Sequence, residues 1–167
     1  GAGPIGLLFT ALLRANGASK LIVSEPSEYR RKAAKEVGAD IVVHPDDLQA
    51  TMEKEMPEGA DVAVEAVGPL LPQVIKLVRS GGRVLQFGHD ETVNPEVPVG
   101  ELLKKEVTIY GAFIGRYSFE KAARIMESGK LPLERIVSHQ LPLSKVHEAI
   151  EMLRAGKALK VVLTPGQ

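Results

Sequence analysis

The chain opens on three glycines within six residues, in the sequence GAGPIG (residues 1–6). Glycine permits tight turns and a close approach to the backbone. Residues 7–14 are largely apolar and compatible with a helix, which Asn16-Gly17 can end. A glycine-rich turn connects two elements of structure. We therefore expect a strand before Gly1 and interpret the sequence as a fragment of a longer chain.

Short aliphatic runs and helical patterns alternate along the next hundred residues. The predicted strands are residues 20–25, 41–43, 61–65, 83–87 and 107–110. Three helices are predicted between these strands. The first follows Ser27 as its N-cap, and the second runs from about residue 46 to 56. The third carries Leu71, Val74, Ile75 and Val78 on one face. Gly81-Gly82 is predicted to turn the chain into the fourth strand. Alternation of this kind predicts an α/β fold with a doubly wound parallel sheet.

The last fifty residues follow a different pattern. We predict one helix with Ser118 as its cap, a second helix after Leu143, and a short strand over residues 160–163. Two helices and a strand beyond the sheet indicate a return into a neighbouring domain. We therefore expect one domain over residues 1–115 and a segment of a second domain over residues 116–167.

Composition excludes several classes of function. Lys plus Arg equals Asp plus Glu at 21 each, so the net charge is zero and nucleic-acid binding is not expected. No apolar run is long enough to cross a membrane. The chain has no cysteine, and its first residues lack the pattern of a secretory signal. These observations favour a cytoplasmic protein.

An acidic residue completes the glycine motif. Glu25 ends the first predicted strand, nineteen residues after Gly6, close to the spacing of about 20 found in dinucleotide-binding folds. In such a site Gly1 permits the turn, Gly3 lets the pyrophosphate approach the backbone, and Gly6 lets the helix pack on the sheet. The positive end of the helix dipole then favours the phosphates.

Two further residues fit this interpretation. Pro4 suits the first helical turn, where its missing N–H costs little. Glu25 would accept hydrogen bonds from the adenosine ribose hydroxyls and would repel a 2′-phosphate, so NAD is expected in preference to NADP. Two alternatives stay open, a purely structural glycine turn with a solvated Glu25, and a flavin enzyme that shares the same motif.

The sequence resembles the zinc-dependent medium-chain alcohol and polyol dehydrogenases, near the sorbitol, butanediol and threonine dehydrogenases. The resemblance covers nearly the whole chain and rests on the order and spacing of several segments. They are GAGPIG at 1–6, SEPSEYR at 24–30, AKEVGAD at 34–40, VEAVG at 64–68, GGRV at 81–84, IYGAF at 109–113 and KVVL at 160–163.

The resemblance implies cofactor contacts beyond Gly1, Gly3, Pro4, Ile5, Gly6 and Glu25. Ala66, Val67 and Gly68 match a strand end near the cofactor, and Phe87 and Gly88 match one beside the nicotinamide ribose. Ala112, Phe113 and Ile114 match a segment whose backbone holds the carboxamide. Arg30 matches a basic residue at the adenosine ribose, and Lys160 matches one at the pyrophosphate. The alternative to these cofactor contacts is that Arg30 and Lys160 are surface charges and that Phe113 is a core residue.

In the resembled family, a zinc ion polarises the substrate alcohol and a hydride passes from carbon to the nicotinamide. Its ligands lie in an N-terminal catalytic domain that we expect to be absent here. The four histidines, His44, His89, His139 and His147, have no recognised metal spacing. The sequence therefore assigns cofactor-binding residues, but no catalytic residue and no metal ligand, and the fragment alone is expected to be inactive.

The resemblance also implies partners. We expect a small alcohol or polyol substrate, and a homodimer or homotetramer that pairs through an edge strand near residues 107–114. Two other functions stay open, a zinc-free reductase of enones or quinones and a non-catalytic NAD-binding module. In the 3-2-1-4-5-6 strand order, the strand expected before Gly1 is central, so the chain expressed alone is predicted to be marginally stable or to aggregate.

Overall fold

The computed structural model describes residues 1–166, which form two compact units. The central unit comprises Gly1 and residues 46–117. The terminal unit comprises residues 2–45 together with the chain from Ser118 onward. Each unit is described by itself. The domain division expected between residues 115 and 116 stays a prediction.

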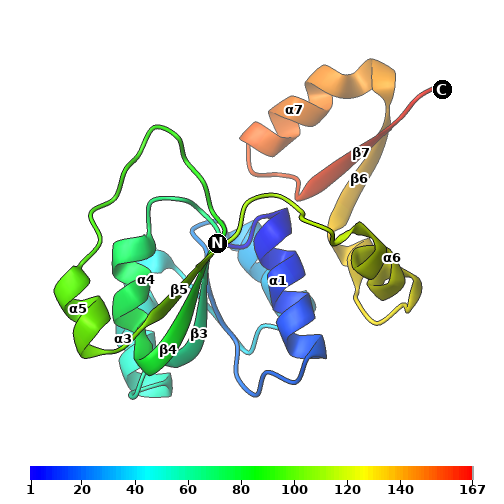
Figure 1. Cartoon of the computed structure of the whole chain (residues 1–167). Coiled ribbons are helices and arrows are strands. Elements are labelled where there is room, and N and C mark those ends of the chain that lie inside the picture. The colour runs from blue at the N-terminus through cyan, green and yellow to red at the C-terminus, as the bar shows by residue number, and fades with distance from the viewer. Residues whose placement is uncertain (167) are drawn as a thin grey trace. The chain divides into compact units, whose positions relative to one another are not determined.

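The central unit is a three-stranded parallel sheet with helices between its strands (Figure 1). Its strands, in the order β3-β4-β5, are β3 (Ala60–Glu65), β4 (Val78–Gln86) and β5 (Thr108–Gly111). Its helices are α3 (Leu48–Glu55), which follows the 3₁₀ turn η1 (Pro45–Asp47), α4 (Leu71–Leu77) and α5 (Val99–Lys104). Its buried core is Ile75, Val78, Val84 and Val107.

The terminal unit contains two separate parallel strand pairs. The first pair, β1 (Ile22–Ser24) with β2 (Ile41–Val43), accompanies α1 (Pro4–Ala15) and α2 (Glu28–Glu36). The second pair, β6 (Val137–Pro142) with β7 (Lys160–Thr164), accompanies α6 (Phe119–Glu127), α7 (Val146–Arg154) and the 3₁₀ turns η2 (Leu133–Arg135) and η3 (Leu143–Lys145). One buried cluster joins both parts of this unit: Ala2, Leu7, Ala11, Ala33, Ala34, Val37, Ala39, Ile136 and Leu159.

The predicted α/β class with parallel strands is confirmed. All the predicted strands are present, and most of their ends lie within one or two residues of the predicted ends. The helix α5 and the strand β6 were not predicted. Within the described residues β1 pairs with β2 alone and β3 with β4 alone, so the strands form separate sheets. The strand expected before Gly1 stays a prediction.

The region between α4 and β4 differs from the prediction. Val78 was expected on the helix, but α4 ends at Leu77 and Val78 is extended, with φ −86° and ψ 151°. Gly81-Gly82 lies within β4 and not in a turn before it. The register shifts here, because Ala60 pairs with Val78 whereas Val62 pairs with Arg83. A Cβ at Gly82 would lie 2.7 Å from the Arg79 carbonyl oxygen, so this irregular stretch needs a glycine.

The two predicted serine caps have different outcomes. The Ser27 hydroxyl accepts a hydrogen bond from the Arg30 backbone N–H at 3.4 Å, which confirms this residue as the cap of α2. Ser118 does precede α6, but its side chain makes no capping hydrogen bond and its backbone is already helical. The prediction of Ser118 as a side-chain cap is wrong.

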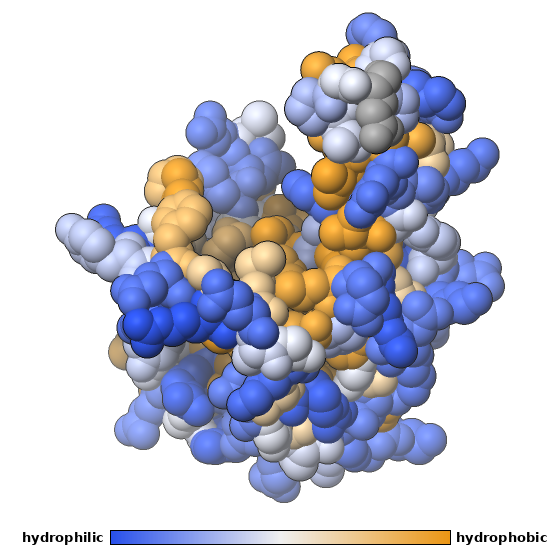
Figure 2. Space-filling model, turned by 90° about the vertical axis from the view of Figure 1, so that its right-hand side faces the viewer, coloured by the Kyte–Doolittle hydropathy of each residue, from blue (hydrophilic) through white to orange (hydrophobic). Residues whose placement is uncertain are grey.

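Large apolar side chains reach the surface of both units, and Figure 2 shows orange hydrophobic atoms between charged groups on one face of the molecule. In the central unit they include Val99, Leu103 and Tyr110. In the terminal unit they include Phe119 and Met126 of α6, a helix without any buried residue. Over the described residues, no helix is long and apolar enough to cross a membrane.

An ion pair fixes the end of α1 to the strand pair of the terminal unit. Asp40 Oδ2 accepts hydrogen bonds from the Leu21 N–H at 2.7 Å and from the Arg14 guanidinium. Arg14 also donates to the carbonyls of Gly38 at 3.0 Å and Ala18 at 2.6 Å. The Leu21 N–H first, and then Arg14, lower the pKa of the Asp40 carboxyl below its ordinary value of 3.8.

We predict that Asp40→Asn lowers the free energy of unfolding at neutral pH by about 0.5–1 kcal/mol, as for partly exposed ion pairs. A carboxyl whose pKa is lowered by folding stabilises the fold while it is charged. Its contribution is therefore present above pH 3.8 and is lost as the pH falls through the lowered pKa. Urea unfolding of the wild type and of Asp40→Asn, at pH values above and below the lowered pKa, measures the difference in the free energy of unfolding. Glu96→Gln, at an exposed position, is the control. A difference that persists at about pH 2 would contradict this origin.

Candidate functional site

The carboxyl end of β1 carries a buried acid that holds the glycine turn. Glu25 is only 4% exposed. Its Oε2 accepts a hydrogen bond from the Ala2 backbone N–H at 2.7 Å, and its Oε1 accepts one from the Ser27 N–H at 3.0 Å. A carboxylate offers about four acceptor positions. Glu25 can therefore hold this turn and still accept hydrogen bonds from a ligand.

The amino end of α1 has the open backbone that an anion requires. Gly3 is the N-cap, with φ −65° and ψ 176°, and no side chain caps the helix. Pro4 occupies the first turn, and the N–H groups of Ile5 and Gly6 have no acceptor within the helix by its geometry. No atom lies within 4 Å of a Cβ built on Gly3. The exposed backbone and the helix dipole together favour a phosphate here.

The other glycines of the turn have different surroundings. Gly6 is buried in α1, where its carbonyl accepts a hydrogen bond from the Thr10 hydroxyl at 2.8 Å. Gly1 belongs to the central unit, where a Cβ built on it would lie 3.3 Å from Val67 Cγ2. Space is therefore limited at these two positions, whereas Gly3 faces open space.

The two predicted basic residues lie in the terminal unit. Arg30 is in the first turn of α2, and its Nε is buried without a hydrogen-bond partner in the described part of the chain. A buried unpaired donor is costly, so this nitrogen fits an oxygen-bearing ligand or a water molecule. Lys160 begins β7 and is exposed. The described contacts do not join Lys160 to the glycine turn.

Glu65, for which the sequence predicted no role, connects the carboxyl ends of β3 and β4 by hydrogen bonds. Glu65 ends β3 and is 2% exposed. Its Oε1 accepts hydrogen bonds from the N–H groups of Val67 at 2.8 Å and Gly68 at 2.9 Å. Its Oε2 accepts from Gln86 Nε2 at 2.6 Å. Its backbone oxygen accepts from the N–H groups of Phe87 at 2.9 Å and Gly88 at 2.8 Å. Two predicted cofactor segments, 66–68 and 87–88, thus share one anchor.

The third predicted segment follows β5. The Ala112 N–H donates to the Gln86 carbonyl at 3.0 Å, which continues the pairing of β4 with β5. Phe113 is 73% exposed and belongs to neither buried cluster of the described residues. Its ring meets the His89 ring edge to face, with centroids 5.7 Å apart. Ile114 is also exposed and has a positive φ of 54°. These side chains are available for a ligand at the carboxyl edge of the sheet.

The predicted residues therefore fall into two groups. The terminal unit brings the turn residue Ala2 against Glu25, and Arg30 lies in the same unit, in the first turn of α2. The central unit brings together the ends of β3, β4 and β5, which are segments 66–68, 87–88 and 112–114.

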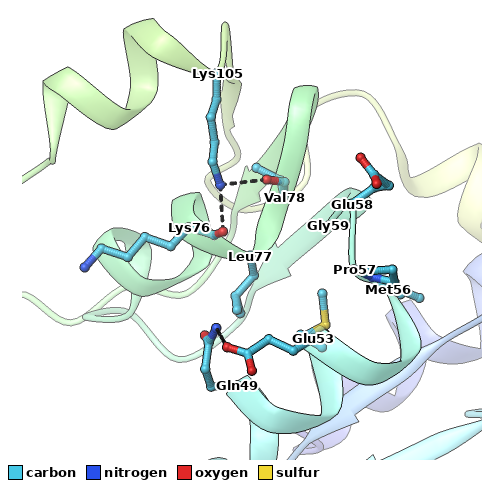
Figure 3. A pocket seen from close by; sticks show the side chains of 11 residues that line it. Gln49, Glu53, Met56, Pro57, Glu58, Gly59, Lys76, Leu77, Val78 and Lys105 are labelled. Atoms are coloured by element: carbon cyan, nitrogen blue, oxygen red, sulfur yellow. Dashed lines mark hydrogen bonds between the residues drawn. The ribbon is translucent and has the colours of Figure 1, made fainter.

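A small pocket of the central unit lies away from these strand ends (Figure 3). It has a volume of about 110 Å³, and its lining includes Gly59 and Val78 near the amino ends of β3 and β4. Ligand pockets usually hold about 300 Å³ or more. Lys105 Nζ donates to the carbonyls of Lys76 at 2.8 Å and Val78 at 3.1 Å. Lys105 thus satisfies the carbonyls of Lys76 and Val78 at the end of α4.

The described residues contain no metal centre. Across residues 1–166, no three His, Cys, Asp or Glu side chains are grouped so that they could hold a metal ion. The sequence contains no cysteine.

A buried acid at a parallel strand end, beside an open glycine turn and a helix amino end, defines the Rossmann type of dinucleotide-binding fold. The sequence model of the family described as "Zinc-binding dehydrogenase" matches residues 4–128. The chain belongs to this family, as the resemblance of its motifs implied.

Similar proteins support this assignment. The chain is 40% identical to an L-threonine 3-dehydrogenase of Thermococcus kodakarensis, over 99% of the chain and 49% of that protein. It is 33% identical to a sorbitol dehydrogenase of Bombyx mori, over 98% of the chain and 49% of that protein. Among solved structures, a putative zinc-binding dehydrogenase from Sinorhizobium meliloti 1021 bound to NADP is 28% identical, with a TM-score of 0.87. The match covers 98% of the chain and 50% of that structure. The chain thus spans about half the length of its relatives.

Proposed function

We propose that this chain binds NAD and forms the cofactor-binding part of an oxidoreductase that acts on a secondary alcohol or polyol. The observation that carries the proposal is the pairing of Glu25 with the glycine turn. The Glu25 carboxylate accepts the Ala2 N–H at 2.7 Å, directly beside the open backbone at Gly3. The relatives named as threonine and sorbitol dehydrogenases support an alcohol substrate.

The residues of the terminal unit would bind the adenosine and pyrophosphate half of the cofactor. The helix amino end at Gly3, Pro4, Ile5 and Gly6 would receive the phosphates. Glu25 would accept the ribose hydroxyls with its remaining lone pairs, and Arg30 would bring its unpaired Nε to an oxygen of the cofactor. Lys160 would attract the pyrophosphate by its charge alone.

The residues of the central unit would bind the nicotinamide half. The backbone of segments 66–68, 87–88 and 112–114 would contact the nicotinamide ribose and the carboxamide. The exposed ring of Phe113 and the side chain of Ile114 would exclude water beside the nicotinamide. The bound cofactor supplies the hydride chemistry, and this chain supplies its position.

Three parts of this proposal go beyond the cofactor site. The zinc ion of the family is expected outside this chain. We propose a homodimer or homotetramer, because the outer edge of β5 is unpaired among the described strands and carries the exposed Tyr110. A cytoplasmic location also stays a prediction.

We predict that Gly3→Ala weakens NADH binding by at least tenfold and leaves the melting temperature unchanged. The new methyl group meets no protein atom within 4 Å, and φ is −65°, so the fold is not strained. It would occupy the space in which the pyrophosphate approaches the backbone. Fluorescence titration with NADH measures the effect in the complete natural gene product. Gly100→Ala, which also meets no atom, is the matched control. Unchanged NADH affinity in Gly3→Ala would exclude this turn as the phosphate site.

The choice between NAD and NADP depends on the charge of Glu25. A solved relative is bound to NADP, so family membership alone does not decide the choice. We predict that Glu25→Gln lowers the preference for NADH over NADPH by about tenfold, equivalent to about 1.4 kcal/mol. The amide keeps one acceptor oxygen but no longer repels a 2′-phosphate.

The ratio of the two dissociation constants measures this preference. Glu28→Gln removes the same charge from an exposed position in the first turn of α2 and serves as control. An unchanged ratio in Glu25→Gln would refute the assigned role.

We predict that Tyr110→Glu lowers the oligomeric state of the complete gene product. Charged side chains on an edge strand oppose pairing with another strand. Tyr110 is 54% exposed, so its replacement does not open the core. Light scattering measures the mass, and Tyr117→Glu, at an exposed tyrosine outside the strand, is the control. An unchanged mass for Tyr110→Glu would place the interface elsewhere.

A further inference from the structure

Glu65 makes an unusual set of contacts for an acid at the end of a strand. Both carboxylate oxygens and the backbone oxygen accept hydrogen bonds, and the donors named above come from two different turns. Gly68 N is also 2.8 Å from Oε2, so the Gly68 N–H is shared between the two carboxylate oxygens. Burying an acid is costly unless donors surround it, and here amide groups supply them.

Gln86 extends this network across the two strands. Its Nε2 donates to Glu65 Oε2 at 2.6 Å, to the Gly88 carbonyl at 2.8 Å and to the Gly68 carbonyl at 3.2 Å. An NH₂ group has two hydrogens, so at least one of them is shared between two of these three acceptors. The Gln86 side chain therefore joins the end of β3 to the turn after β4.

The two turns pack backbone against backbone at this point. A Cβ at Gly88 would lie 2.3 Å from the nitrogens of Val67 and Gly68, and 2.6 Å from Glu65 Oε2. Gly68 has a φ of +130°, and its Cβ would lie 2.9 Å from Asp90 Cβ. Neither position accepts a side chain without displacing its neighbours. The carboxylate thus holds a close contact between two glycine turns.

We infer that Glu65, with Gln86, is a positioning residue for the nicotinamide half of the cofactor. This inference rests on the proposed function, because segments 66–68 and 87–88 are the segments assigned to that half. The Glu65 carboxylate accepts hydrogen bonds from protein groups at both oxygens, and these bonds fix the backbone of both segments. Ligands of open α/β sheets bind at the carboxyl ends of the strands, where this network lies.

The amide of Glu65→Gln cannot reproduce the network. One acceptor oxygen becomes an NH₂ donor, which then faces a backbone N–H or the NH₂ of Gln86. At least one hydrogen bond is lost, and the two turns are no longer held by a charge. The other half of the proposed cofactor site depends on Glu25 in the terminal unit and keeps its own hydrogen bonds.

The test compares two ligands, NADH and 5′-AMP, in the complete natural gene product. We expect Glu65→Gln to weaken NADH binding by about tenfold, as for the loss of a buried charged hydrogen bond, and to change 5′-AMP binding by less than about twofold. A role in global stability alone would not separate the two ligands. Hydrogen exchange should also become faster at the amides of Val67, Gly68 and Gly88.

Two further variants complete the design. Asp61→Asn, on the same strand, removes an acid whose exposed ion pair with Arg79 spans 2.7 Å, and should change neither affinity. Gln86→Met removes the Nε2 donor and keeps the carboxylate, so it should also weaken NADH selectively. If Glu65→Gln does not fold, the comparison of NADH with 5′-AMP is made with Gln86→Met.

The outcomes separate the two proposals. Equal effects on NADH and 5′-AMP, or no effect on either, would overturn the positioning role while the cofactor site stands. A wild-type protein that binds neither ligand would overturn the proposed function itself, and the inference with it.

Discussion

A carboxylate buried at the end of a parallel strand must be surrounded by hydrogen-bond donors, because burial removes the water that would otherwise solvate its charge. In this chain Glu25 and Glu65 both meet that condition with backbone N–H groups. Each acid therefore dictates the path of the chain beside it. The turn at Ala2 is held by Glu25, and the turn at Val67 and Gly68 is held by Glu65. The conformation of both predicted halves of the cofactor site depends on this constraint.

The same constraint explains where side chains are not tolerated. An N–H group can reach a buried carboxylate only if the backbone comes close, and a neighbouring turn that shares the space must then lack a Cβ. Gly88 meets this requirement, since its Cβ would lie 2.6 Å from Glu65 Oε2. Gly3 differs, because its Cβ would meet no protein atom. A glycine needed for packing and a glycine left open for a ligand are thus distinguished by their surroundings.

Much of the fold could be predicted, because continuous aliphatic runs such as Ile41–Val43 match the strands directly. The errors occur where tertiary contacts override local pattern. Val78 fits the apolar face of a helix, yet it extends β4, because it pairs with Ala60 across a register shift. The helix α5 has only six residues, and Val99, Leu102 and Leu103 at i, i+3 and i+4 make one repeat, which is too short to distinguish a helix from a loop.

The candidate site was predictable in part for a similar reason. Glu25 has a known spacing from the glycines. The partners of Glu65 are backbone N–H groups, which no residue type reveals, and the side chain of Gln86, which lies 21 residues away in the sequence. The available signal was an acid in an apolar strand, three residues before a glycine. The exposure of Phe113 was not predictable either, because an aromatic residue after a strand suits the core and the surface equally.

The double role of Glu25 bears on how a dinucleotide would be recognised. The Ala2 and Ser27 N–H groups hold both of its oxygens before any ligand arrives, so the side chain would lose little freedom on binding. Pre-organisation of this kind lowers the cost of association. The same fixed charge would stand against a 2′-phosphate, and a rigid carboxylate cannot turn away to relieve that repulsion. The proposed selectivity for NAD would therefore depend on how firmly Glu25 is held, as well as on its charge.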